Sequence, residues 1–227
     1  DAYLRTSAGI QSITLPRCRW HAHPPYGRLL FTMHEQDVPT DPLELFSEWL
    51  ADAREQTLYS GVTLATVAPD GQPSARVVLL RGHDERGFVF YTNYESRKAA
   101  ELETNPLAAM LFWWRDLRRQ IRIEGQVDSV SREESEAYFR SRPHGHQLGA
   151  WVSAQSQVIP GRETLDQRLI DVTNRFGDRD VPCPPQWGGY RLVPAAIEFW
   201  EEGEHRLHDR LRYRRGTSGW ILERLAP

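Results

Sequence analysis

The segment "GVTLATVAPDGQPSARVVLLRGHDERGFVFYT", residues 61–92, decides the fold. Two runs rich in β-branched residues, at 61–68 and 74–81, flank the turn signal Asp70-Gly71. A third such run, at 88–92, follows a second polar turn. Three short strands joined by tight turns predict an antiparallel meander, and therefore a sheet with hairpin connections.

Further strands extend this meander on its C-terminal side. Alternating or continuous apolar runs predict them at 107–114, 120–130, 188–200, 206–215 and 219–227. We therefore predict six to eight antiparallel strands with helices inserted between them. This corresponds to a mostly β fold with helices, in the α+β class, built on a small barrel.

Four helices are predicted between and before these strands. The first, at 40–56, begins with Asp41 as the N-cap and buries a stripe of Phe46, Trp49, Leu50 and Ala53. The others are predicted at 96–105, at 131–142 and at 161–177. Residues 1–39 show no sustained period and are predicted to form an extended N-terminal arm, so that residues 40–227 make up one domain.

Composition narrows the function classes. The 227 residues carry a formal net charge of −3, without the basic excess typical of nucleic-acid binding proteins. Cys18 and Cys183 are the only cysteines and predict neither a disulfide framework nor a metal site. No apolar run approaches the roughly 20 residues that span a bilayer. We expect a cytoplasmic protein with a small-molecule partner and neither a nucleic-acid nor a membrane partner.

Cationic side chains in the meander indicate an anion site. Arg76 and Arg81 lie on opposite faces of the strand at 74–81, while Arg97 and Lys98 begin the next helix. Exposed N–H groups and the positive dipole end of a helix favour an anion such as a phosphate. The alternatives are edge-strand charges and a solvated first turn.

Other candidates are polar residues suited to a heterocyclic ligand. Gln120, Gln155 and Ser156 are neutral donors and acceptors, although ordinary polar surface explains them equally well. Tyr138 and Arg142 are four residues apart on one predicted helical face, where they would bind one group of ligand oxygens or form a surface stack.

The C-terminal region adds a third group of cations. On the strand predicted at 206–215, Arg206, His208 and Arg210 alternate onto one face, near Trp200. A histidine between two arginines indicates a site for an anionic ligand. A solvated strand face is the alternative.

These motifs occur together and in order. They are "RVVLLRG", "GFVFYTNYESRKAAEL", "RQIRIEG", "YFRSRP", "QLGAWVSAQS", "WGGYRL", "EFW", "RLHDRLRY" and "ERLAP", spread over residues 76–227. From about residue 40 onward, the sequence closely resembles the pyridoxamine 5'-phosphate oxidase family. The resemblance implies an antiparallel FMN-binding split β-barrel that works as a homodimer, with C-terminal dimerisation strands and with FMN bound between the subunits.

The resemblance also implies roles for individual residues. Arg206 and His208 are the expected catalytic residues, where Arg206 orients the substrate and His208 polarises its ring substituents. The expected substrate contacts are Arg81, Tyr138, Arg142, His146, Arg206, Leu207 and His208. The expected FMN contacts are Arg76, Val77, Val78, Leu79, Leu80, Arg81, Tyr91, Thr92, Arg97, Lys98, Gln120, Gln155, Ser156, Trp200 and Arg210.

The activity implied is oxidation of pyridoxamine or pyridoxine 5'-phosphate to pyridoxal 5'-phosphate, with O2 reduced to hydrogen peroxide. Two alternatives are a flavin oxidase for another aromatic substrate, such as a phenazine precursor, and a non-catalytic FMN or pyridoxal phosphate binder. The sequence departs from the family at Arg81, usually Lys, at His146, usually Ser, and at Glu201-Glu202, where Gln-Gly is usual. The family's N-terminal R-R-x-Y element is not recognisable before Thr40.

Overall fold

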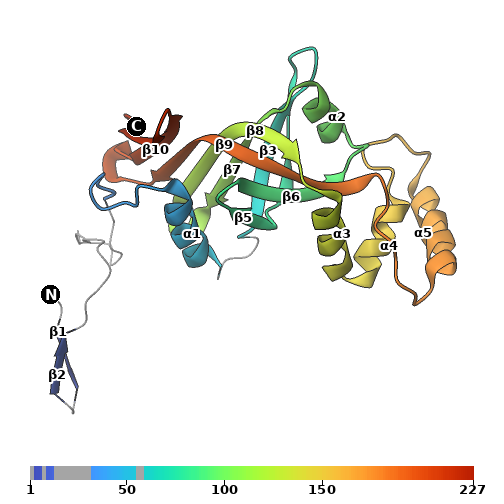
Figure 1. The fold of residues 1–227 in the computed structure, drawn as a ribbon, viewed down its shortest axis with the longest axis horizontal. Coiled ribbons are helices and arrows are strands. Elements are labelled where there is room, and N and C mark those ends of the chain that lie inside the picture. The colour runs from blue at the N-terminus through green and yellow to red at the C-terminus, as the bar shows by residue number, and fades with distance from the viewer. Residues whose placement is uncertain (1–2, 7–8, 13–31, 55–58) are drawn as a thin grey trace.

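The computed structural model describes residues 3–6, 9–12, 32–54 and 59–227. Within them, nine antiparallel strands form one sheet that curls into a half-barrel (Figure 1), which confirms the predicted mostly β fold. The count exceeds the six to eight expected, since the short β5 forms between two predicted strands. The strands are β3 (Gly61–Val67), β4 (Pro73–Leu79), β5 (Gly82–Asp84), β6 (Gly87–Asn93), β7 (Leu107–Trp114), β8 (Arg119–Ser129), β9 (Trp187–Glu201), β10 (Asp209–Gly216) and β11 (Gly219–Arg224).

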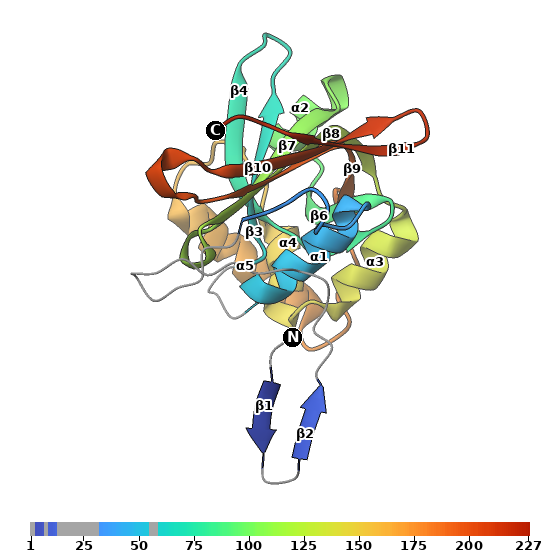
Figure 2. The ribbon, with the colours of Figure 1, turned by 90° about the vertical axis from the view of Figure 1, so that its left-hand side faces the viewer.

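The sheet follows the order β11-β10-β9-β8-β7-β3-β4, and β6 pairs with β9 and β5. The meander at 61–92 is therefore only partly consecutive in space: β3 pairs with β4, whereas β6 crosses to β9. The backbone N–H of Arg81 donates to Val89 O at 2.8 Å, which joins the end of β4 to β6. Figure 2 shows the hairpin of β3 and β4 projecting from the sheet.

The long strand β9 organises the fold. Its first half, from Trp187 to Leu192, pairs with β6, and its last part, from Ala196 to Glu201, pairs with β10. Between the halves, the register with β8 shifts at Glu124/Gly125. Pro194 lacks a backbone donor, and a Cβ on Gly125 would lie 2.0 Å from Val193 O. β9 therefore keeps β8 along one edge, and on its other edge the partner changes from β6 to β10 at this irregularity.

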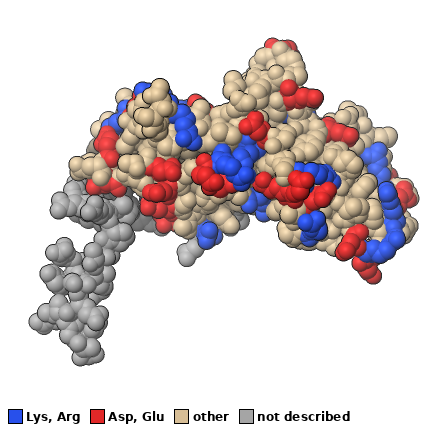
Figure 3. Space-filling model, in the orientation of Figure 1, with Lys and Arg blue, Asp and Glu red and all other residues tan. Residues whose placement is uncertain are grey.

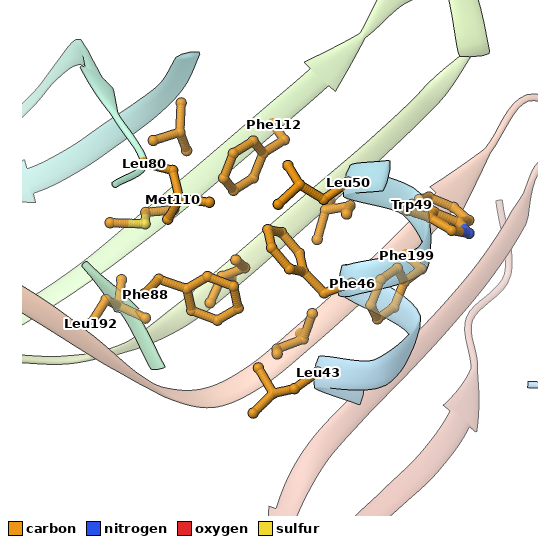
Figure 4. Close-up of a cluster of buried hydrophobic side chains, with 14 of the residues drawn as sticks. Leu43, Phe46, Trp49, Leu50, Leu80, Phe88, Met110, Phe112, Leu192 and Phe199 are labelled. Carbon is orange, nitrogen blue, oxygen red and sulfur yellow. The ribbon is translucent and has the colours of Figure 1, made fainter. Parts of the chain in front are cut away.

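Helix α1 (Pro42–Ala53) packs against the concave side of the sheet and fills the main core (Figure 4). Asp41 caps it by accepting from the Leu43 N–H at 3.0 Å, as predicted. The ring of Phe46 meets those of Phe88 and Phe112 edge to face, with centroids 4.8 and 5.4 Å away. All four residues of the predicted stripe are buried, which confirms the helical period.

Truncation of Phe46 tests the role of this helix. Since Phe46 is fully buried between aromatic rings, Phe46→Ala is expected to lower the free energy of unfolding by about 3–5 kcal/mol. Urea denaturation followed by fluorescence measures the change. The exposed Glu48→Ala on the same helix is the control and should stay within about 0.5 kcal/mol of the parent.

Helices α3 (Arg132–Ser141), α4 (His144–Val152) and α5 (Arg162–Phe176) gather at the end of the molecule where β9 begins (Figure 1). They enclose a second, smaller core of Phe139, Leu148, Ala150, Phe176, Val181 and Trp187. Helix α2 (Arg97–Thr104) follows β6. Two short 3-10 helices, η1 (Arg115–Leu117) and η2 (Glu204–Arg206), link strands. No helix of the described residues has the length and apolar character to cross a membrane.

The predicted N-terminal arm is described only in part. Strands β1 (Tyr3–Thr6) and β2 (Gly9–Ser12) pair with each other, whereas residues 1–2, 7–8 and 13–31 lie outside the described residues. Just before α1, the Met33 N–H donates to Asp209 at 3.1 Å, and the Tyr213 hydroxyl donates to Pro39 O at 2.7 Å. The chain that enters α1 is thereby attached to β10.

Candidate functional site

Two adjoining clefts lie where β4, β6, α2 and the segments around α3 and α4 meet. The larger has a volume of about 850 Å³ and the smaller about 530 Å³. Tyr91, Thr92 and Gln155 line both, so the two clefts share a wall. The larger is also lined by Arg81, Tyr138, Arg142, His146 and Trp187, and the smaller by Arg76, Val77, Val78, Arg97, Lys98 and Ser156.

The smaller cleft brings three cations together at the start of α2. Arg76 comes from β4, and Arg97 and Lys98 form the first turn of the helix. Ser96 occupies the N-cap position, but its hydroxyl accepts from Lys98 Nζ at 3.0 Å and makes no capping bond to the helix. The first-turn N–H groups and the three cations are therefore suited to an anion.

Lys98 is buried among neutral groups. Its Nζ donates to Thr92 Oγ1 at 2.9 Å and to Gln155 Oε1 at 3.0 Å, in addition to Ser96. Burial, together with the nearby charge of Arg76, lowers the pKa of Lys98 to about 8, against the opposing effect of Glu101. An anion in this cleft would offset the burial of the ammonium group.

The larger cleft contains a stack of aromatic rings. Tyr91 and Tyr138 have ring centroids 4.0 Å apart at 20°, and Trp187 lies nearly parallel to both, 5.5 Å from Tyr91 and 6.2 Å from Tyr138. Burial is the main reason that the pKa of Tyr91 rises to about 12, so this phenol stays neutral. The stack forms a flat wall that suits a planar ring.

The guanidinium carbon of Arg142 lies 4.6 Å from the centroid of the Trp187 ring. Its Nη1 is buried and has no hydrogen-bond partner among the described residues. Burial also lowers the pKa of Arg142. Arg81 and His146 line the same cleft and are exposed, and Arg81 lies 6.0 Å from the Tyr138 ring. The cleft therefore combines a flat wall with a guanidinium group that lacks an acceptor.

A second group of predicted residues lies at the far end of β9. Gln120 pairs with Trp200, and Trp200 pairs with Arg210, so the three are neighbours across β8, β9 and β10. Arg210 is held by the buried Glu198, whose Oε1 accepts from its Nε at 2.7 Å. Glu198 also accepts from Arg122 at 2.6 Å. Glu198 thus fixes the arginine beside Trp200.

His208 lies beside the Trp200 ring, with the centroids 4.6 Å apart. Its Nδ1 accepts from the Gly203 N–H at 3.2 Å, which leaves Nε2 available to a ligand. Arg206 and Leu207 precede it and are exposed. The whole loop is therefore presented at the surface next to Trp200 and Arg210.

The two groups lie at opposite ends of β9. Trp187 is its first residue and Trp200 its fourteenth, so about 40 Å of extended chain separates them at roughly 3.3 Å per residue. Figure 1 shows β9 running from the side of α3 and α4 to the side of β10. The predicted contact residues therefore form two half-sites within one chain, the first at the two clefts and the second around Trp200.

Two details of the predicted geometry are wrong. The strand expected at 206–215 begins only at Asp209, because His205 and Arg206 have φ values of 55° and 65° in the turn of η2. Arg206, His208 and Arg210 therefore do not alternate along one strand. Arg142 is likewise outside the helix of Tyr138, in extended conformation after Ser141. Tyr138 and Arg142 still line one cleft.

Some residues that shape the clefts or hold a predicted contact residue were absent from the sequence-based set. Glu101 binds Arg76 and Arg97, and its spacing of four from Arg97 on a helix was an available signal. Trp187 forms part of the aromatic wall, and Glu198 holds Arg210. Neither role has a local sequence signal, since both depend on strand pairing.

Comparison with known proteins places the chain in a family. A family model described as pyridoxamine 5'-phosphate oxidase matches residues 59–175, and one described as pyridoxine 5'-phosphate oxidase C-terminal dimerisation region matches residues 187–227. The pyridoxine/pyridoxamine 5'-phosphate oxidase of Rubrobacter xylanophilus is 53% identical over 195 residues, or 85% of this chain and 90% of the relative. The chain belongs to the pyridoxamine 5'-phosphate oxidase family.

Other relatives of this family are similar over most of the chain. The pyridoxine/pyridoxamine 5'-phosphate oxidase of Cupriavidus taiwanensis is 52% identical over 202 residues, which cover 88% of this chain and 95% of the relative. Among solved structures, PhzG from Burkholderia lata 383, in complex with tetrahydrophenazine-1-carboxylic acid, has a TM-score of 0.80 and 34% identity, covering 85% of this chain and 95% of PhzG.

A pyridoxamine 5'-phosphate oxidase-related, FMN-binding protein from Nostoc punctiforme has a TM-score of 0.66 at 20% identity, covering 81% of this chain and 96% of the other. At this identity it supports the fold alone. The split-barrel architecture expected for an oxidase of this family is confirmed.

Proposed function

We propose that this chain is an FMN-dependent oxidase that converts pyridoxamine or pyridoxine 5'-phosphate to pyridoxal 5'-phosphate and reduces O2 to hydrogen peroxide. The observation that carries the proposal is the pair of adjoining clefts, each with its own cations for a phosphate group and a shared wall at Tyr91. Two phosphate-bearing aromatic molecules, one per cleft, are what this arrangement suits best.

The residues of the smaller cleft fit FMN. Arg76, Arg97 and Lys98 would bind its phosphate, and Gln155 and Ser156 would bind polar groups next to it. Burial of the Lys98 ammonium among neutral acceptors is the observation that favours an anion here. FMN, when bound, supplies the redox chemistry of substrate oxidation and of oxygen reduction.

The larger cleft fits the phosphorylated vitamer. Arg142 offers a buried Nη1 that lacks an acceptor, and Arg81 adds a second cation. Tyr138 and the neighbouring rings provide a flat wall for the pyridine, and His146 lines the same cleft. These residues would orient the substrate ring against the FMN in the adjoining cleft.

The second half-site would come from another copy of the chain. The strand register places Val77, Leu111 and Trp113 on one outer face of the sheet, where Val77 is 68% and Trp113 50% exposed. The same face continues to Trp200 and Arg210. Residues 187–227 match a dimerisation region. A homodimer that buries this face would bring Trp200, Arg206, His208 and Arg210 to the clefts of its partner.

Charge is mixed on one face of the molecule. Figure 3 shows acidic and basic side chains interspersed over the face in view. The anion sites of this proposal therefore depend on local groups of cations in the clefts.

The second candidate function is oxidation of a different aromatic substrate, which the 34% identity to PhzG favours. Arg142 and Arg81 distinguish the two candidates, because two guanidinium groups match the charge and the acceptor oxygens of a phosphate better than those of the single carboxylate of a phenazine carboxylic acid. We therefore favour the phosphorylated vitamer.

One assay tests these candidates. The purified protein is examined for the absorption of bound FMN, and peroxide release is followed with pyridoxamine 5'-phosphate and with unphosphorylated pyridoxamine. A yellow protein that turns over only the phosphorylated vitamer supports the proposal. A flavin-loaded protein without turnover would indicate a binding protein, and turnover of a phenazine precursor alone would indicate the second candidate.

Lys98 gives the FMN site a pH dependence. With its pKa at about 8 in the free protein, Lys98 is charged below pH 8 and neutral above it. If the charged form is the one that binds phosphate, FMN affinity should fall about ten-fold between pH 7 and pH 9, by linkage of a single proton. Fluorescence titration of the flavin-free protein measures this change. Lys98→Met should bind FMN more weakly, and with a flatter profile over the same range.

A further inference from the structure

Glu101 is a buried carboxylate in the middle of the cations of the smaller cleft. It lies on α2 and is 2% exposed. Four side chains donate to it: Thr66 at 2.5 Å, Ser74 at 2.6 Å, Arg97 Nε at 2.8 Å and Arg76 Nη2 at 3.2 Å. Two of these four donors are arginines that line the cleft.

These bonds fix the two arginines in different ways. Arg97 is tied through Nε, and its side chain is otherwise 59% exposed, so both Nη groups remain free to point at a ligand. Arg76 is bound through Nη2 to Glu101 and Ser74 and through Nη1 to Thr66. A long exposed arginine held at Nε loses less conformational freedom on binding a phosphate than an untethered one.

The negative charge of Glu101, taken by itself, would weaken phosphate binding. Although burial opposes ionisation, hydrogen bonds from Ser74, Thr66, Arg97 and Arg76 lower the pKa of Glu101 to about 2, so it is a carboxylate at neutral pH. A negative charge near a phosphate site weakens anion binding by simple Coulomb repulsion. If Glu101 acts by positioning, removing its charge should lower the affinity for FMN. If it acts by repulsion, removing its charge should raise that affinity.

We propose that Glu101 is a positioning residue that holds Arg97 toward the flavin phosphate and fixes Arg76 beside it, and so makes the cleft select FMN over riboflavin. This inference rests on the proposed function. Glu101 acts through the arginines and touches no reacting atom. Its effect is therefore confined to ligands that carry a phosphate.

The first test compares Glu101→Gln with the parent by fluorescence titration of the flavin-free protein with FMN and with riboflavin. FMN affinity is expected to fall about ten-fold or more, the size typical of one lost charge-assisted contact, with riboflavin affinity within roughly three-fold of the parent. Glu103→Gln, on the exposed side of the same helix, is the matched control and should change neither.

A double-mutant cycle separates positioning from a general effect on folding. In an Arg97→Ala background, Glu101→Gln should cost much less FMN affinity than in the parent, because one of the groups that it positions is gone. Equal costs in both backgrounds, an FMN affinity that is unchanged or higher in Glu101→Gln, or a proportional loss of FMN and riboflavin would overturn the inference.

A second variant tests the inference if Glu101→Gln does not fold. If Glu101→Gln binds neither flavin, Glu101→Asp decides, since it keeps the charge but retracts it by one methylene. It should lose FMN affinity selectively, and a proportional loss of both flavins would again count against the inference. Failure of the parent itself to bind FMN would instead contradict the proposed function.

Discussion

Arg142→Ala is expected to lower kcat/KM for pyridoxamine 5'-phosphate about hundred- to thousand-fold. The guanidinium group has a buried Nη1 without a partner and lies over the Trp187 ring, so it is fixed and ready to donate to a phosphate oxygen. Two charge-assisted hydrogen bonds at roughly 1.5–3 kcal/mol each, reduced for non-additivity to about 3–4 kcal/mol together, give this range. Steady-state kinetics of peroxide release measures it.

The substrate without phosphate provides the control for this prediction. Unphosphorylated pyridoxamine should be a poor substrate of the parent and an equally poor one of Arg142→Ala, because the missing contact involves only the phosphate. The exposed Arg140→Ala on α3 should behave as the parent with both substrates. An equal loss with both substrates would mean that Arg142 serves mainly to hold Trp187 in place.

Periodicity in the sequence was sufficient to predict most elements. The strands β3, β4, β6, β7 and β8 and the helix α1 fall where alternation and capping signals place them. The reason is that each of these elements has a buried face set by its own residues, such as Phe46 and Trp49 on α1. Local patterns are reliable where burial follows the period of the element.

Local patterns fail where the backbone is determined by other parts of the chain. The segment around Arg206 alternates like a strand, yet two consecutive residues with positive φ form a turn there. The change of partner along β9 depends on the irregularity opposite Pro194, which no alternation pattern encodes. Non-local pairing therefore overrides propensity at both places.

The sequence named many of the candidate site residues, but it said less about how they are arranged in space. Residue patterns singled out Arg76, Arg97, Lys98 and Arg142, the resemblance implied their roles, and the structure brings them to two adjoining clefts. The sequence places Trp200 at the end of a predicted strand, but it does not reveal that the clefts lie at the start of that strand. Acidic partners such as Glu198 were missed because a buried glutamate on a strand resembles an ordinary polar position until its cross-strand neighbours are known.

A site shared between two subunits predicts recovery of activity in mixed dimers. Arg142 belongs to the clefts, whereas Arg206 belongs to the half-site that a second copy would provide. Arg142→Ala and Arg206→Ala homodimers should both be nearly inactive, since each damages every site. In a heterodimer of the two, one site receives both substitutions and the other receives neither, by the two-fold symmetry of an isologous dimer. Its activity should be about half that of the parent dimer.

Co-expression of the two variants with different affinity tags, followed by tandem purification, isolates this heterodimer for the peroxide assay. The matched control is a heterodimer of Arg206→Ala with His208→Ala, whose substitutions lie in the same half-site near Trp200. Each of its two sites contains one substitution, so it should stay as inactive as its parents. Recovery in neither heterodimer, with FMN retained in both, would mean that Arg142 and Arg206 of the same chain serve one site, and would contradict the shared arrangement.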